Sequence, residues 1–462
     1  MNKKSTYFDQ MWVRIFAVSL FLVIALLAGC SGETILDSVF PTRTVQETTQ
    51  VPVDESPTSS TAEEDATESV LTPQPTAQDA QNFTVEQSEL LVWLPEEFST
   101  MTNSEASLIL QQRIQDFERQ NPGVVVSVRV KASSGTSGIL DSLKNTKLAA
   151  PAALPQIVLL PQSDMQEAAE QQLILPIEEF IRTSDPQKFY SYASEISSWD
   201  GISYGFPFVG DALVGMTTEE ITTSDFITWD EIRAQNAPLY FAANYPQARL
   251  FISQYLSSGG VLVDEQEHAM IAEENMLTVL DMFDQNLKNK TFSPSFSSLN
   301  TSEDVWNAFL SGETQWVINW ASMALQSDME DLKVFQLPSL GPEPYVSATG
   351  WVWSIVNTNT DTSEVEALFI EFLCNPTFLA EYSQAAGYLP VMPDSLTLYN
   401  DDGSLNQISN ILIAAHTFPE NDLILEIGPI FRDATLAVLN QTGTIEEITA
   451  TAQQQLEALQ TK

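Results

Sequence analysis

The first thirty residues of the chain hold one long run of hydrophobic positions behind a basic start. Basic residues up to Arg14 precede an apolar segment from Ile15 to Leu27. A basic stretch followed by about 13 apolar residues is typical of a secretory signal, and it is shorter than the roughly 20 residues of a membrane-spanning helix. The pattern therefore predicts that residues 1–29 are the signal peptide of an exported protein.

The pattern of apolar and polar positions is lost in the next sixty residues. Between residues 31 and 88, Thr, Ser, Pro, Gln, Asp and Glu dominate, and eleven acidic residues face a single base, Arg43. Such a composition buries too little apolar surface to offset the entropy lost on ordering. We expect residues 30–88 to be a disordered, acidic, Thr/Ser/Pro-rich tether that spans on the order of 40 Å.

From residue 89 onward, short apolar runs alternate with helical periodicity. Leu110, Ile114 and Phe117 recur at the spacing of one helix face. This helix is flanked by predicted strands, and a further strand follows; the three read ELLVWL, VVVSVRV and QIVLLP. Alternation of strand and helix predicts an α/β fold with a parallel sheet and right-handed crossovers.

Several later helices begin at recognisable capping residues. Capping boxes start at Thr228 and Ser363, and Thr444 to Glu447 forms a similar cap before a C-terminal amphipathic helix. The helix after Ser363 carries one apolar stripe, made of Val365, Leu368, Phe369, Phe372 and Leu373. The folded body of about 370 residues is long enough to supply a large core, which we expect to form two domains.

Charge and cysteine content narrow the class of protein. The net charge of −43 argues against nucleic acid and against an anionic membrane surface as partners. It also disfavours anionic substrates, although a local basic pocket remains open. Only Cys30 and Cys374 are present, and Cys374 is expected on the buried side of a helix, so no intramolecular disulfide is predicted.

The end of the signal peptide reads Leu-Ala-Gly-Cys, which resembles the lipobox of bacterial lipoproteins. The resemblance implies cleavage before Cys30 and acylation of that residue, for example with palmitate, which would hold the protein at the outer side of the cell membrane. The alternatives are an ordinary signal peptide with a chance cysteine, or an uncleaved anchor.

One segment, VWNAFLSGETQWVINWASM, predicts a helix that ends at Gly312, a short strand, and Trp320 at the carboxyl end of that strand. Open α/β sheets bind ligands at that edge. With this segment the chain resembles the extracellular solute-binding proteins of bacterial ABC importers, in the sugar-binding group that includes maltose-binding protein. The other landmarks, in the expected order, include FERQNPGVVVSV, WDGISYGFPFVGDAL, TWDEI, GWVWSIV and ALFIEFLCNPTFLAEYSQAAGYLPV.

The resemblance implies a two-lobed periplasmic-binding-protein fold of type II, with crossing hinge segments near Tyr204 to Asp211 and Gln336 to Gly341. Lobe 1 would be residues 89–207 plus 338–385, and lobe 2 residues 208–337 plus 386–462. It further implies a monomeric receptor, without cofactor or metal, that binds a neutral carbohydrate between the lobes and delivers it to the permease subunits of an ABC transporter.

Sugar sites combine an aromatic face for the C–H surface of the ring with polar groups for its hydroxyls. Trp320 matches the position where maltose-type proteins stack a ring, and Asp211 matches an acidic residue on the hinge-side wall of their cleft. The side chain of Trp320 could instead serve packing in the core. The remaining candidates for ligand contact are Trp351, Trp93, Gln162, Ser163, Asn244 and Tyr204.

Three other functions remain open at this stage. An acidic cleft lined by aromatic rings also suits a cationic solute such as a polyamine, and the same fold could serve a membrane sensor. A glycoside-active enzyme would need a pair of carboxylates at a defined separation. The two histidines, His268 and His416, lie in no metal-ligand spacing, so no metal site is predicted.

Overall fold

The computed structural model divides after Gln81, and the folded part of the chain belongs to the second unit, Asn82–Lys462. It describes residues 88–177, 180, 188–221, 227–266, 268–329, 331–358, 364–399 and 405–460. The signal peptide, Cys30 and nearly all of the tether lie outside these residues and stay predictions. No helix in the described part of the chain is long and apolar enough to cross a membrane.

The first strands follow the predicted order. β1 (Ser88–Pro95) lies between β2 (Val124–Lys131) and β3 (Ile157–Pro161) and runs parallel to both. All three match the apolar runs from which they were predicted. The helix predicted between the first two strands is α2 (Glu105–Gln120), and Leu110, Ile114 and Phe117 are buried on one of its faces.

Two long strands extend this sheet beyond β3, of which the first runs opposite to β3 and the second in the same direction as β3. β10 (Val346–Ile355) pairs antiparallel with β3 and with β6 (Phe206–Thr217). β6 is buried along its whole length and pairs antiparallel with β8 (Trp316–Trp320) and β9 (Lys333–Phe335). The prediction of a parallel sheet is therefore wrong beyond β3, because the chain returns through β10 between the parallel strands and the rest.

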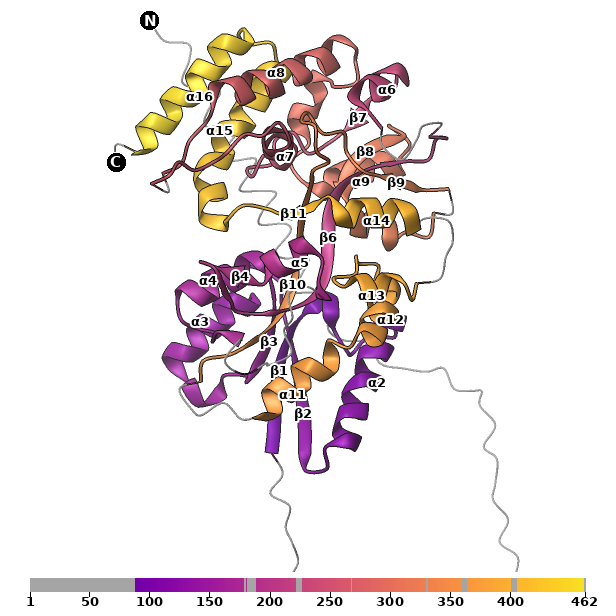
Figure 1. The fold of residues 1–462 in the computed structure, drawn as a ribbon, viewed down its shortest axis with the longest axis vertical. Coiled ribbons are helices and arrows are strands. Elements are labelled where there is room, and N and C mark those ends of the chain that lie inside the picture. The colour runs from indigo at the N-terminus through magenta and orange to yellow at the C-terminus, as the bar shows by residue number, and fades with distance from the viewer. Residues whose placement is uncertain are drawn as a thin grey trace, which may run out of the picture. The chain divides into compact units, whose positions relative to one another are not determined.

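Within the described residues the sheet has nine strands, in the order β2-β1-β3-β10-β6-β8-β7, with β9 beside β6 and β11 beside β10. β7 (Leu239–Tyr240) and β11 (Ala415–Thr417) are short, and β4 (Ser198–Trp199) and β5 (Ile202–Ser203) form a separate hairpin. β6 and β10 run through the middle of Figure 1 and link its lower and upper parts.

The buried side chains form two hydrophobic clusters. The first cluster surrounds β1, β3 and most of β10 and extends over one face of β6 and β8. Its helices are α2, α3 (Ile139–Ala149), α4 (Gln162–Glu170), α5 (Ser191–Ile196), α9 (Ser302–Leu310), α10 (Ala321–Leu325), α11 (Glu364–Leu373), α12 (Pro376–Ala386), α13 (Pro393–Leu396) and α14 (Leu405–Ile413).

The second cluster lies on the other face of β6 and β8. Its helices are α6 (Trp229–Ala234), α7 (Arg249–Ser257), α8 (Glu273–Lys288), α15 (Asn421–Leu439) and α16 (Ile445–Gln460), which gather in the upper part of Figure 1. The predicted lobe boundaries stay a prediction, but α13 and α14, which we place in lobe 2, pack in the first cluster.

Local signals in the sequence correspond to local structure at several positions. The capping box at Thr228 is formed, and Thr444 Oγ1 accepts the N–H of Glu447 at 3.3 Å. Gly312 has φ of 78°, the left-handed conformation that its place behind a helix predicts. The stripe on α11 is incomplete, since Leu368 is 46% exposed.

Candidate functional site

A cavity of about 80 Å³ lies between elements of the two clusters. The first cluster contributes Gln162 and Ser163, at the start of α4, and Thr349 of β10. The second cluster contributes Arg249, at the start of α7. Trp320, at the end of β8, packs against the second cluster and also lines the cavity. The cavity thus lies at the carboxyl ends of β3 and β8, the edge at which α/β sheets bind ligands.

Trp320 is the half-buried aromatic residue of this cavity. Its place at the carboxyl end of β8 confirms the position that the sequence predicts for it within the strand. The guanidinium of Arg249 lies 4.6 Å from the centroid of the Trp320 ring. A cation over one face of the indole leaves its opposite face and edges for a ligand.

Arg249 is held by neutral groups. Its Nε donates to Oε1 of Gln247 at 2.9 Å, and Nη2 donates to the hydroxyl of Tyr245 at 3.3 Å. The Tyr245 ring centroid lies 4.8 Å from the guanidinium. Burial lowers the pKa of Arg249, while Tyr245 and Asp211 act to raise it. No carboxylate of the described residues lies within ion-pair distance of this guanidinium.

Asp211 lies in β6, is only 4% exposed, and does not line the cavity. Its carboxylate accepts hydrogen bonds from the backbone N–H and hydroxyl of Ser322 and from the backbone N–H of Ala212. Burial raises the pKa of Asp211 to about 6, against the effect of these hydrogen bonds and of Arg249. In this arrangement Asp211 supports the turn that follows Trp320.

Gln162 and Ser163 differ in how much of their hydrogen-bonding capacity is used. Nε2 of Gln162 donates to Thr417 Oγ1 at 2.6 Å and to the carbonyl of Phe418 at 3.2 Å, and its Oε1 accepts from Thr349 at 3.3 Å. The Gln162 amide therefore uses its hydrogen bonds to link α4 with β10 and with the residues at the end of β11. The hydroxyl of Ser163 has a weaker partner, Asp164 Oδ1 at 3.5 Å, and is the freer of the two for a ligand.

The structure does not bring the two other candidate tryptophans to this cavity. Trp93 is 2% exposed, with Nζ of Lys131 above its ring at 4.2 Å. Trp351 is half-buried, and its ring centroid lies 5.3 Å from that of Phe98 and 4.9 Å from that of Tyr388. The alternation of side chains along a strand did not predict these contacts of Trp93 and Trp351.

Asn244 and Tyr204 also lie outside the lining of the cavity. Nδ2 of Asn244 donates to Oδ1 of Asn300 at 2.8 Å, which fixes the loop after β7. Tyr204 precedes β6, and its ring centroid lies 6.2 Å from that of Trp199. Their ligand contacts therefore stay predictions, as does the role of Tyr204 in a hinge.

Sequence reasoning missed Arg249, the charged residue of the site. One signal was present: Arg249 is the only charged residue between Arg233 and Asp264. It also opens a helix, where the macrodipole disfavours a cation. An isolated charge in an unfavourable helix position is a reason to ask what it binds.

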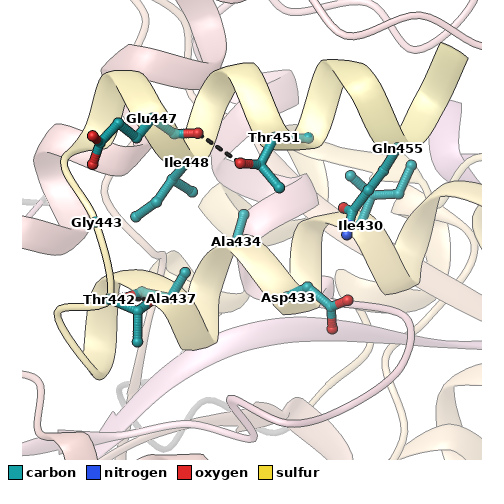
Figure 2. A pocket seen from close by; sticks show the side chains of 11 residues that line it. Ile430, Asp433, Ala434, Ala437, Thr442, Gly443, Glu447, Ile448, Thr451 and Gln455 are labelled. Carbon is teal, nitrogen blue, oxygen red and sulfur yellow. Dashed lines mark hydrogen bonds between the residues drawn. The ribbon is translucent and has the colours of Figure 1, made fainter.

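A second cavity, of about 180 Å³, lies between α15 and α16. Figure 2 shows Ala434 and Ile448 pointing into the space between the two helices, with Ile430 and Gln455 towards one end and Thr442 and Gly443 towards the other. All of its lining comes from these two helices and their connection, and none of the predicted ligand contacts is among them. Among the described residues, no group of three or more His, Cys, Asp or Glu side chains is placed to hold a metal ion.

The fold is similar to the folds of solved sugar-binding proteins. The maltose-bound MalE3 of T. maritima is 18% identical, and the match covers 80% of this chain and 99% of that one with a TM-score of 0.60. The cyclic alpha-maltosyl-1,6-maltose binding protein of Arthrobacter globiformis is 15% identical, with coverage of 80% and 98% and a TM-score of 0.66. These likenesses show the two-lobed fold that the sequence predicts.

Sequence comparison agrees with the fold. The maltotriose-binding protein of Pyrococcus abyssi is 24% identical over 266 residues, which are 54% of this chain and 58% of that protein, so the match spans less than two thirds of that relative. The model of the family described as bacterial extracellular solute-binding protein matches residues 112–406. Because that match covers more than half of the chain, the protein belongs to the family of bacterial extracellular solute-binding proteins.

Proposed function

We propose that the chain is an extracytoplasmic receptor that binds a carbohydrate between its two lobes and delivers it to an ABC permease. The observation that carries the proposal is the meeting of a half-buried indole, Trp320, with polar side chains from both clusters at one cavity. A sugar ring needs both an apolar face and hydrogen-bonding partners for its hydroxyls. The maltotriose, maltose and cyclic maltosyl-maltose in the names of the similar proteins support a saccharide ligand.

The size of the cavity bears on how such a ligand would enter. About 80 Å³ is well below the roughly 300 Å³ at which small-molecule pockets begin. A saccharide would therefore bind a form in which the two sides of the cavity stand further apart, and closure around it would be selected by contacts to both sides. The permease would then recognise the closed form, and the chain itself would perform no chemistry.

The charges around the cavity disfavour two of the alternatives. A polyamine would need carboxylates to balance its charge, but no acidic residue lines the cavity, and the cation of Arg249 beside Trp320 would repel it. A glycoside-cleaving enzyme would need two carboxylates about the scissile bond, and the lining offers none. Both features favour a carbohydrate-binding protein over these two alternatives.

The position of the protein in the cell is part of the proposal. Acylation of Cys30 would anchor the chain to the membrane, and the acidic residues 31–88 would let the receptor reach its permease. Cleavage by a lipoprotein-processing peptidase and the presence of acyl chains would be visible in the mass of the mature N-terminus.

Calorimetry and thermal unfolding of the full chain in mild detergent test the binding function. Maltose, maltotriose and cyclic maltosyl-maltose are compared with putrescine and spermidine. A saccharide at 100 times its Kd should stabilise the fold by about 2.7 kcal/mol. Stabilisation by polyamines alone, or sustained release of product from glycosides, would contradict the proposal.

A further inference from the structure

The cavity between the two clusters has a charge opposite to that of the protein. The chain carries a net charge of −43. Yet Arg249 is the one charged residue among those that line this cavity, and the others are neutral polar or apolar. A ligand in the cavity would thus meet a cation, in a protein whose remaining surface repels anions.

The charge of Arg249 is poorly compensated by the protein. Its hydrogen bonds go to an amide oxygen of Gln247 and to the hydroxyl of Tyr245, both neutral. The carboxylate of Asp211 is already engaged by Ser322 and Ala212. A largely buried cation without an ionic partner is costly, and a position at the first residue of α7 adds the unfavourable helix dipole.

One donor nitrogen of Arg249, which lines the cavity, is free for a ligand. Among the described residues, Nη1 of Arg249 has no hydrogen-bond acceptor, whereas Nε and Nη2 each have one. The guanidinium also borders the Trp320 ring, at 4.6 Å from its centroid. A group bound to Nη1 would therefore lie beside any sugar ring that stacks on or against the indole.

We propose that the carbohydrate recognised by this cavity is a sugar acid, whose carboxylate pairs with Arg249 while a neutral ring of the same molecule packs against Trp320. The inference rests on the proposed function and specifies its ligand class. Carboxylates match the planar fork of a guanidinium better than any neutral hydroxyl does. Ligand binding would then supply the counter-charge that the folded chain lacks.

The test compares each acid with its own uncharged derivative. Glucuronate- and galacturonate-containing di- and trisaccharides, and the methyl ester of each, are titrated calorimetrically into the full chain in mild detergent, with maltotriose as a neutral reference. We expect at least one acid to bind about 10- to 100-fold more tightly than its ester, as for hydrogen bonds to charged groups. Raising NaCl from 50 to 500 mM should reduce that ratio only in part, since the pair is buried.

Variants connect the preference to Arg249. Arg249→Gln should bring the acid and its ester to similar affinity, and Arg249→Lys should retain part of the preference. Arg432→Gln is the matched control, because Arg432 lies on α15 and pairs with Asp433 away from the cavity. This control should keep the full ratio.

The possible outcomes distinguish the sugar-acid proposal from the proposed carbohydrate receptor on which it rests. If maltotriose or the esters bind as tightly as the acids, or if Arg249→Gln keeps the preference, the sugar-acid proposal is overturned and the carbohydrate receptor stands. If no saccharide binds, both the sugar-acid proposal and the proposed carbohydrate receptor are wrong. The comparison of acid with ester on the unmodified chain decides the matter even if Arg249→Gln does not fold.

Discussion

Ser322 donates two hydrogen bonds to the carboxylate of Asp211, from its backbone N–H at 3.0 Å and from its hydroxyl at 2.5 Å. Asp211 belongs to β6, and Ser322 to the first turn of α10, two residues after Trp320. The buried acid therefore fixes the turn that carries the aromatic residue of the cavity, without lining the cavity itself.

Replacing Asp211 with Asn should change the pH dependence of stability. Burial raises the pKa of Asp211 from 3.8 to about 6, so the folded state binds the proton more tightly than the unfolded state does. The stabilisation by the protonated acid is complete below about pH 4 and is lost as the pH rises through 6. The free energy of unfolding of the wild type should thus fall by about 2 kcal/mol more than that of Asp211→Asn between pH 4.5 and 7.5.

Urea unfolding of both proteins at the two pH values measures this difference. Burial also raises the pKa of Asp164 to about 6, but Asp164 is present in both proteins and cancels in the comparison. Parallel curves for the wild type and Asp211→Asn would show that Asp211 keeps an ordinary pKa.

Truncation of Trp320 should weaken the binding of carbohydrate. Trp320→Ala removes the aromatic face at the cavity, and the expected loss is about 1–3 kcal/mol of binding free energy. Calorimetric titration with the saccharide found by screening gives the number. Trp306→Ala is the control, since Trp306 is half-buried against Phe309 on α9, outside the cavity lining. Equal affinity of wild type and Trp320→Ala would assign Trp320 to packing.

The anchor is testable independently of the fold. Cys30→Ala removes the predicted site of acylation, and a signal peptide without its lipobox cysteine leaves no lipid on the mature chain. We expect the protein to move from the membrane fraction to the soluble exported fraction when cells are fractionated. Retention in the membrane fraction would point to an uncleaved N-terminal segment as the anchor.

The strands and helices could be predicted where a single face is periodic. The buried face of α2, the strand β8 and the place of Trp320 at its end all follow from local spacing. Which strands become neighbours does not, because periodicity reveals a buried face but not its partner. That is why the antiparallel insertion of β10 between β3 and β6 was not predicted.

The site was less predictable than the fold for the same reason. Trp93 and Trp320 both stand towards the ends of predicted strands, yet only Trp320 reaches the cavity, whereas Trp93 is covered by the core and Lys131. Arg249 meets Trp320 only because α7 and β8 pack in the same part of the fold. The contact between two residues that are far apart in the chain cannot be recognised from the spacing of apolar and polar positions.

The connection between β9 and β10 offers a last test, of the return crossing predicted near Gln336 to Gly341. A Cβ on Gly341 would lie 2.2 Å from the carbonyl oxygen of Ser257, the last residue of α7. The same Ser257 accepts the N–H of Leu340 on its hydroxyl at 3.1 Å. Gly341→Ala must therefore push the crossing segment and α7, the helix that begins with Arg249, apart.

We expect Gly341→Ala to cost about 1–3 kcal/mol of unfolding free energy, as overpacking against rigid backbone does, and to weaken saccharide binding as well, because the helix that carries Arg249 is displaced. Urea unfolding and calorimetry measure the two effects. Gly443→Ala is the control, since the nearest atom to its Cβ would be the end of a side chain, a carboxylate oxygen of Glu447 at 3.2 Å, and not rigid backbone. If Gly341→Ala is destabilised but binds saccharide with unchanged affinity, the crossing supports the fold without setting the position of α7 in the binding site.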